Sequence, residues 1–94
     1  LVLARTTPRE ALPPSERTRG LSLFLVDLRE ARGQGTIAVE PVRTTFNYET
    51  YTVTYRGLRV PEDALIGEEG GGFRAVLDGW NAERILLGAE CIGD

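Results

Sequence analysis

The sequence predicts a mainly β region followed by one long α-helix. Residues 21–28 form a near-continuous apolar run, and residues 50–55 alternate tyrosine or valine with threonine, two patterns that are typical of β-strands. From about Gly71 onward, apolar residues recur at the spacing of an α-helix. A proline, an acidic pair and three consecutive glycines separate the two patterns. We therefore expect a β region followed by a helix that begins at about Gly71.

Composition excludes several classes of function. The net charge is −3 and no basic cluster is present, which argues against a nucleic-acid partner. No apolar run approaches the roughly 18 residues that a membrane span requires, so we expect no membrane partner and a cytoplasmic location. Because the chain has one cysteine and no histidine, it holds no disulfide framework, no Cys/His zinc site and no Ser-His-Asp triad, and no metal site is predicted.

The length of 94 residues allows at most one small domain. The chain begins with leucine and stops inside an apolar pattern, so we expect it to be a piece of a longer protein. Its single cysteine, Cys91, lies at helical spacing and is expected to be a small core residue.

The N-terminal third contains two predicted strands and a loop. Residues 1–6 form a short apolar run that fits the end of a buried strand. Residues 7–20 hold three prolines and no hydrophobic periodicity, so an exposed loop is expected there. Residues 21–28 are predicted to be a strand that is buried on both faces, followed by a polar connection over residues 29–34.

Two further strands are expected in the middle of the chain. Residues 36–42 form the first, and its proline places it near a sheet edge or a bulge. Residues 43–49 read as a turn, in which Asn47 tolerates unusual backbone angles. In residues 50–55 the tyrosines and the valine share one face and the threonines the other, so one face is expected to be buried. Three or four antiparallel strands make this an all-β unit rather than a βαβ unit.

The predicted helix begins at about Gly71, next to the acidic residues Glu68 and Glu69, and runs past the end of the chain. The glycines lack the spacing of a nucleotide-binding loop, so they are interpreted as a flexible joint. A helix this apolar needs protein partners that the chain does not contain. Its main apolar stripe consists of Phe73, Val76, Leu77, Trp80, Leu87 and Cys91.

Arg84 is the unexpected residue of this helix, because it projects within about 20° of the centre of the apolar stripe. A buried guanidinium must meet a carboxylate, carbonyl groups or a bound ligand. Alternatively, its apolar stem packs against the stripe while its head reaches water or Glu68. Spacing alone leaves both interpretations open.

Four other residues of the helix are candidates for chemistry. Glu83 and Glu90 lie on the flank of the stripe, where a carboxylate beside a dry pocket suits a general base, because desolvation raises its pKa. The alternative is a solvated helix face. Asn81 is able to satisfy a buried polar group, although asparagine is common on helices. Phe73 either fills the core or forms one wall of a cleft.

Four segments together strongly resemble the acyl-CoA dehydrogenase family. They are LSLFLVD at residues 21–27, LRVPED at residues 58–63, LIGEEGGGF at residues 65–73 and NAERI at residues 81–85. The resemblance implies an N-terminal helical domain, a middle β domain and a C-terminal four-helix domain around FAD and an acyl-CoA thioester. On this basis residues 1–66 are the C-terminal part of the middle β domain. Residues 67–94 are then the truncated first helix of the C-terminal domain.

The resemblance also implies an activity, the α,β-dehydrogenation of acyl-CoA in fatty acid metabolism. In the family a glutamate removes the proton alpha to the thioester carbonyl, and the β-hydride passes to the FAD flavin. Electrons then usually leave through an electron-transfer flavoprotein, and the parent protein is expected to be a homotetramer. Two alternatives are an acyl-CoA oxidase or flavin monooxygenase of the same fold, and a non-catalytic β-domain scaffold. The isolated fragment is expected to be inactive.

The site residues follow from the same resemblance. In the isovaleryl-CoA and long-chain enzymes the catalytic base lies on this helix, immediately before the arginine. The matching residue in this chain is Glu83. In most members of the family the base lies in a later region. Arg84 matches the arginine beside the acyl-CoA site. Asn81 stands where many members have aspartate near the pantetheine arm, and Phe73 matches an aromatic along that arm. No cofactor-binding residue is assigned, because the family's main FAD segments precede this region.

One segment departs from the family pattern. Members commonly have Arg-x-Ser-x-Thr before the last strand, where this chain has FNYET at residues 46–50. Only Thr50 matches, which predicts a less typical subfamily.

Overall fold

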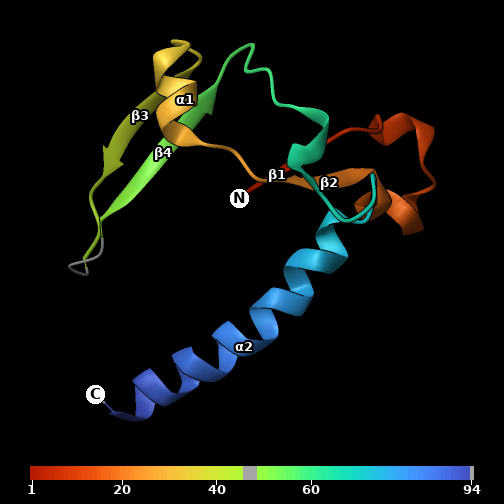
Figure 1. The fold of residues 1–94 in the computed structure, drawn as a ribbon. Helices are drawn as coiled ribbons and strands as arrows, with labels where there is room; N and C mark the ends of the chain where they lie inside the picture. The colour runs from red at the N-terminus through yellow and green to blue at the C-terminus, as the bar shows by residue number, and fades with distance from the viewer. Residues whose placement is uncertain (46–48, 94) are drawn as a thin grey trace. The chain divides into compact units, whose positions relative to one another are not determined.

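The computed structural model describes residues 1–45 and 49–93. The chain divides into two compact units (Figure 1). The first, here the strand–helix unit, combines Leu1–Leu25 with Glu62–Asp94; the second, the hairpin unit, comprises Val26–Pro61. Antiparallel strands in two sheets and a C-terminal helix agree with the predicted mainly β region followed by a helix.

The strand–helix unit is built on a three-stranded sheet. Its central strand β2 (Leu21–Phe24) pairs antiparallel with β1 (Val2–Arg5) and with β5 (Leu65–Ile66). In this sheet Leu23 is 5% exposed and Ser22 is fully buried. The pairing of β2 with β5 joins segments that lie more than 40 residues apart in the sequence. The short strand β5 follows the 3₁₀ turn η3 (Glu62–Ala64). β5 was not predicted from the sequence.

Residues 7–20 are mostly exposed, as predicted, but they are not a plain loop. They form two 3₁₀ helices, η1 (Arg9–Ala11) and η2 (Pro14–Gly20). Pro14 starts η2 with its φ angle already close to the helical value. The Arg5 guanidinium donates to the carbonyl of Arg17 at 3.2 Å, which ties η2 to the end of β1. Sequence reasoning missed these helices because neither has hydrophobic periodicity.

The predicted strand at residues 21–28 is too long. The strand β2 ends at Phe24, and Asp27 is the N-cap of a short helix, α1 (Leu28–Gly33). Its carboxylate accepts hydrogen bonds from the backbone N–H of Arg29 at 2.8 Å and of Glu30 at 3.3 Å. The segment predicted as a polar connection is thus mostly helical, because an aspartate satisfies the unpaired N–H groups of its first turn.

Asp27→Ala is expected to destabilise α1 by about 1 kcal/mol, since no side chain would then satisfy these N–H groups. Faster amide hydrogen exchange at Arg29 and Glu30 would report the loss. Asp27→Asn is the matched control, because asparagine caps a helix about as well as aspartate does. If Asp27→Asn behaved like Asp27→Ala, the carboxylate charge rather than the cap would stabilise the helix.

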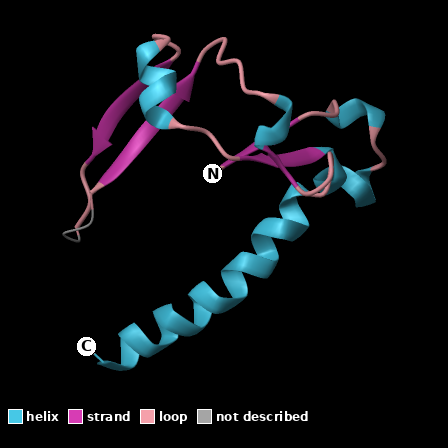
Figure 2. Cartoon of the chain, in the orientation of Figure 1, coloured by secondary structure: helices cyan, strands magenta, loops and turns pink. Residues whose placement is uncertain are grey.

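The hairpin unit pairs two predicted strands in one antiparallel sheet (Figure 2). β3 (Ile37–Val42) and β4 (Thr50–Tyr55) run in register from Ile37 opposite Tyr55 to Val42 opposite Thr50. Because the sheet has two strands, each has an open edge, in agreement with the position predicted for Pro41. Helix α1 packs on β3.

The predicted buried face of β4 is only partly covered, because Val53 is half-buried while the tyrosines of the strand are exposed. The predicted turn residue Asn47 and the rest of 46–48 lie outside the described residues.

Ser22 connects the glycine turn to the sheet of the strand–helix unit. The backbone N–H of Gly70 donates to Ser22 Oγ at 2.8 Å, and this oxygen is also 2.7 Å from Thr6 Oγ1. Gly70 has a φ angle of 82°, which favours glycine. The joint predicted as flexible is therefore held by specific hydrogen bonds.

Ser22→Ala is expected to lower the free energy of unfolding by about 1–3 kcal/mol, because it leaves the Gly70 N–H without its acceptor. Urea unfolding followed by circular dichroism would measure this change. Ser15→Ala removes an exposed hydroxyl from η2 and should change stability by less than about 0.5 kcal/mol. Equal effects of the two substitutions would contradict the role of Ser22.

Helix α2 (Gly72–Gly93) confirms the predicted long helix. Only its first turns are covered by the sheet, and every described residue from Asp78 onward is exposed. Trp80 is 48% and Ile92 is 89% exposed. From Trp80 onward the apolar stripe therefore has no covering element within the described residues, and Cys91 is exposed rather than a core residue. No helix in the described residues combines the length and apolarity needed to cross a membrane.

Candidate functional site

One face of α2 carries a shallow hollow of about 450 Å³, here the α2 hollow. Its residues are spaced three and four apart, so they fall on neighbouring turns of one helix face. Most of its lining is apolar, with one carboxylate and one guanidinium. The lining residues are Leu77, Trp80, Glu83, Arg84 and Leu87.

Arg84 is held by residues of its own helix. Its Nη2 donates to Asn81 Oδ1 at 2.7 Å, and its Nε donates to the carbonyl oxygen of Trp80 at 3.4 Å. The side chain thus folds back toward the preceding turn, as helical side chains do. Arg84 is exposed. The described residues therefore do not bury its guanidinium, which was one of the two interpretations of the stripe. The alternative prediction, that the head reaches water or Glu68, agrees with this exposure, although the guanidinium bonds to Asn81 instead of Glu68.

Glu83 lines the same hollow as Arg84 and is exposed. Within the described residues the two side chains form no ion pair with each other. No element of the described residues covers the apolar part of α2 around Glu83. Glu83 is therefore not desolvated here in the way that would favour a general base. A dry pocket at this position requires further protein or a bound apolar group.

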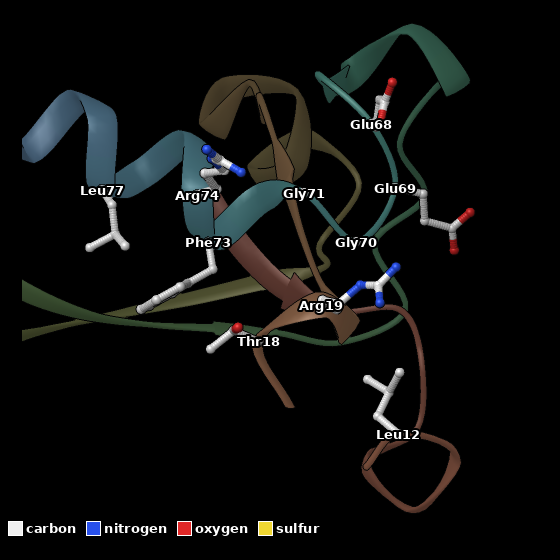
Figure 3. Close-up of a pocket in the computed structure, with 10 residues that line it drawn as sticks. All are labelled: Leu12, Thr18, Arg19, Glu68, Glu69, Gly70, Gly71, Phe73, Arg74 and Leu77. Atoms are coloured by element: carbon white, nitrogen blue, oxygen red, sulfur yellow. The ribbon is translucent and has the colours of Figure 1, made fainter. Parts of the chain in front are cut away.

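Phe73 lies apart from the other three predicted site residues. It is ten residues before Glu83, which corresponds to about 15 Å along an α-helix. Its ring is half-buried in a second hollow of about 590 Å³ at the start of α2 (Figure 3). Leu77 lines both hollows and projects to the same side of the helix as Phe73. The structure thus brings Glu83 and Arg84 together in the α2 hollow, and Asn81 lies beside them only through its hydrogen bond to Arg84.

The second hollow contains charged residues that sequence reasoning missed. Arg19 and Arg74 line it beside the glycine turn, with Thr18 and Leu12 on the side of η2 (Figure 3). Arg19 also forms an ion pair with Glu16 at 2.8 Å. No local signal identifies this grouping, because η2 and the start of α2 are brought together by contacts between distant segments, such as the pairing of β2 with β5 and the bond from Gly70 to Ser22.

The hairpin unit has a hollow of its own, of about 380 Å³, between α1 and the sheet. The Tyr51 hydroxyl donates to Glu49 at 2.8 Å, and this hydrogen bond together with the negative charge of Glu49 raises the pKa of Tyr51. The lining residues are Leu28, Arg29, Arg32, Val39, Tyr51 and Val53. They combine no nucleophile with a base.

The described residues provide no built cofactor site. Among them no three acidic, cysteine or histidine side chains lie close enough to hold a metal ion. In the described ranges every buried side-chain nitrogen or oxygen has a hydrogen-bond partner. No buried polar group is therefore unpaired in a way that would indicate a missing flavin. The described residues therefore identify no group that would hold FAD, the cofactor that the resemblance implies.

Comparison with known proteins supports the predicted resemblance. An acyl-CoA dehydrogenase of Mycobacterium tuberculosis, FadE29, is 30% identical over 76 residues, which cover 81% of this chain and 19% of the relative. The predicted resemblance to the acyl-CoA dehydrogenase family is confirmed. A second relative, the acryloyl-CoA reductase (NADH) of Anaerotignum propionicum, is 29% identical over 93 residues, or 99% of this chain and 22% of the relative.

The acyl-CoA dehydrogenase-like chain spans about a fifth of the length of both relatives. The two names describe redox enzymes that act on CoA thioesters. No protein-family model matches the chain. No solved structure matches it either.

Proposed function

We propose that this chain is a segment of an oxidoreductase that interconverts saturated and α,β-unsaturated acyl-CoA, with α,β-dehydrogenation as the leading direction. The observation that carries the proposal is the α2 hollow, where Glu83 and Arg84 meet an apolar surface. An apolar surface with few polar groups suits an acyl chain that ends in a polar thioester. The similarity to the two acyl-CoA redox enzymes supports the same substrate class.

Glu83 is the proposed general base. Removing the proton alpha to the thioester carbonyl needs a carboxylate within hydrogen-bonding reach of that carbon. The negative charge that develops on the thioester oxygen is favoured by a nearby cation. Arg84 lines the same hollow and offers such a cation, so one helix supplies both the base and the charge.

The rest of the machinery is proposed to lie outside this chain. FAD would supply the two-electron acceptor, held by other segments, because the described residues form no site for it. Residues 1–66 would then belong to the middle β domain and residues 67–94 to the first helix of the C-terminal domain. The proposal includes an electron-transfer flavoprotein as the electron acceptor. It also includes a homotetrameric assembly of the parent protein. Phe73 would contact the pantetheine arm about 15 Å from Glu83.

The reverse reaction is the second candidate, because the acryloyl-CoA reductase (NADH) aligns with 99% of this chain. In that direction Glu83 would begin protonated and donate its proton to the α carbon. The same residues therefore serve both directions, and the direction depends on the electron partner rather than on this hollow.

The full-length protein, incubated with saturated acyl-CoA and an artificial electron acceptor, is expected to form the α,β-unsaturated product. Consumption of NADH with acryloyl-CoA would instead support the reductive direction. Hydrogen peroxide formed in the presence of oxygen would favour an oxidase. Absence of all three activities in a flavin-loaded preparation would reject the proposal in favour of a non-catalytic scaffold.

A further inference from the structure

The hollow of about 380 Å³ in the hairpin unit, here the hairpin hollow, lies between α1 and the two-stranded sheet. Its floor is one face of β3 and β4, because Val39 lies directly opposite Val53 and Tyr51 lies two residues before Val53 on the same strand. Its wall is α1, which packs on β3 (Figure 1). The α1 residues that line it are Leu28, Arg29 and Arg32. The hollow therefore combines an apolar floor with two cations.

The two arginines of the hairpin hollow have no anionic partner within the described residues. Neither guanidinium forms a hydrogen bond or an ion pair there, and no carboxylate lines the hollow. Two carboxylates of the same unit are engaged elsewhere, since Asp27 caps α1 and Glu49 accepts the hydroxyl of Tyr51. Arg29 and Arg32 are three residues apart, so they lie side by side on one face of α1. The hollow thus carries two adjacent positive charges without compensation.

The hairpin hollow is too open to enclose a small molecule. Leu28 is 46% and Tyr51 is 47% exposed, and both arginines are exposed. A small-molecule site buries about 70–90% of its ligand, which this surface does not do. A polypeptide covers such a surface from one side, and tyrosine and arginine are enriched among the residues that dominate protein–protein binding. The exposure therefore favours a protein segment as the occupant.

We propose that the hairpin hollow docks an acidic segment of a partner protein, which places carboxylates on the two arginines and an apolar side chain over Tyr51 and Val53. Charge complementarity selects this partner, because a neutral or basic segment would leave both cations without an anion. Arginine binds a carboxylate through two parallel N–H···O bonds, which fixes the orientation of the segment. The docking goes beyond the proposed function, since no residue of the α2 hollow takes part in it.

The test uses the full-length protein and a labelled synthetic peptide that alternates aspartate with leucine. Fluorescence anisotropy measures its binding at about 0.15 M salt, where charges separated by more than about 8 Å are largely screened. Arg29→Gln/Arg32→Gln is expected to bind the peptide about tenfold more weakly, because each exposed arginine–carboxylate pair contributes a modest part of the affinity. Arg56→Gln/Arg59→Gln is the matched control, since it removes two exposed arginines of the same unit that do not line the hollow. Its affinity should stay within about twofold of the wild-type value.

Two further peptides separate the charge from the apolar contact. One replaces every aspartate by asparagine, and the other replaces every leucine by serine. Both are expected to bind the wild-type protein at least about tenfold more weakly than the first peptide. Circular dichroism should show that the arginine variants are folded, because the substituted side chains are exposed. Peptide binding decides the proposal whether or not the protein turns over acyl-CoA.

Five results would overturn the proposal. A wild-type protein that does not bind the first peptide at millimolar concentration would show that another segment of the parent protein covers the hollow. Equal weakening in the two double variants would indicate attraction by net charge alone. Equal binding of all three peptides would exclude recognition by charge and apolar contact. Displacement of the peptide by inorganic phosphate at constant ionic strength would assign the arginines to a small anion. An oligomer that dissociates in Arg29→Gln/Arg32→Gln would identify a second copy of the chain as the occupant.

Discussion

Glu83→Gln is expected to lower kcat for acyl-CoA by about 10²- to 10⁴-fold, the range that general acid–base catalysis supplies. Glutamine has nearly the shape of glutamate but accepts no proton at its amide under these conditions. The α proton of the substrate would then have no acceptor in the α2 hollow, which Glu83 lines together with Arg84. Substrate binding should change little, because the apolar wall and the arginine remain. Steady-state kinetics and acyl-CoA titration measure the two quantities separately.

Glu90→Gln is the matched control for this experiment. It makes the same chemical change on the same helix, seven residues later, at a residue that does not line the hollow. We expect its kcat to remain within a few-fold of the wild-type value. Near-normal activity of Glu83→Gln would place the base outside α2, in a segment beyond this chain. A loss that is equal in both variants would indicate a structural effect of charge removal on the helix.

The regular elements with a clear periodicity were predictable from the sequence. β4 has the bounds that the alternation of tyrosine or valine with threonine predicts, and α2 begins within one residue of the predicted start. β5 was not predictable, because two residues carry no period and their pairing depends on β2, more than 40 residues earlier. The apolar run at residues 21–28 concealed the cap at Asp27, since apolar character alone does not separate a strand from the start of a helix.

The placement of the predicted site residues could be anticipated only in part, and their roles remain predictions. Asn81 and Arg84 are three residues apart, and helix geometry alone places such a pair within reach, which the 2.7 Å bond confirms. Burial was not predictable in the same way. The stripe around Trp80 is apolar enough for a buried helix, but the described residues leave it exposed, because burial depends on partners that periodicity does not specify. The position of Phe73 in a separate hollow required the fold of η2 against the glycine turn.

Gly72, the buried first residue of α2, packs directly against the sheet of the strand–helix unit. A Cβ atom at this position would lie 2.5 Å from the backbone nitrogen of Leu23 and 2.5 Å from the carbonyl carbon of Ser22. Both are backbone atoms of the central strand β2, so neither moves without disturbing the pairing of β2 with β1 and β5. Gly72→Ala is therefore expected to destabilise the protein by about 3 kcal/mol, the upper part of the range for overpacking. Urea unfolding followed by circular dichroism measures the change.

Gly79→Ala tests the same exchange on the same helix without the steric conflict. No atom lies within 4 Å of a Cβ built at Gly79, so only helix propensity changes, and the variant should be more stable by about 0.5–1 kcal/mol. The two substitutions are thus expected to have opposite signs. A stabilising effect of Gly72→Ala would show that the start of α2 moves freely away from β2. The hydrogen bond from Gly70 to Ser22 would then not hold the joint, and the start of α2, with Phe73, would not be fixed against the sheet.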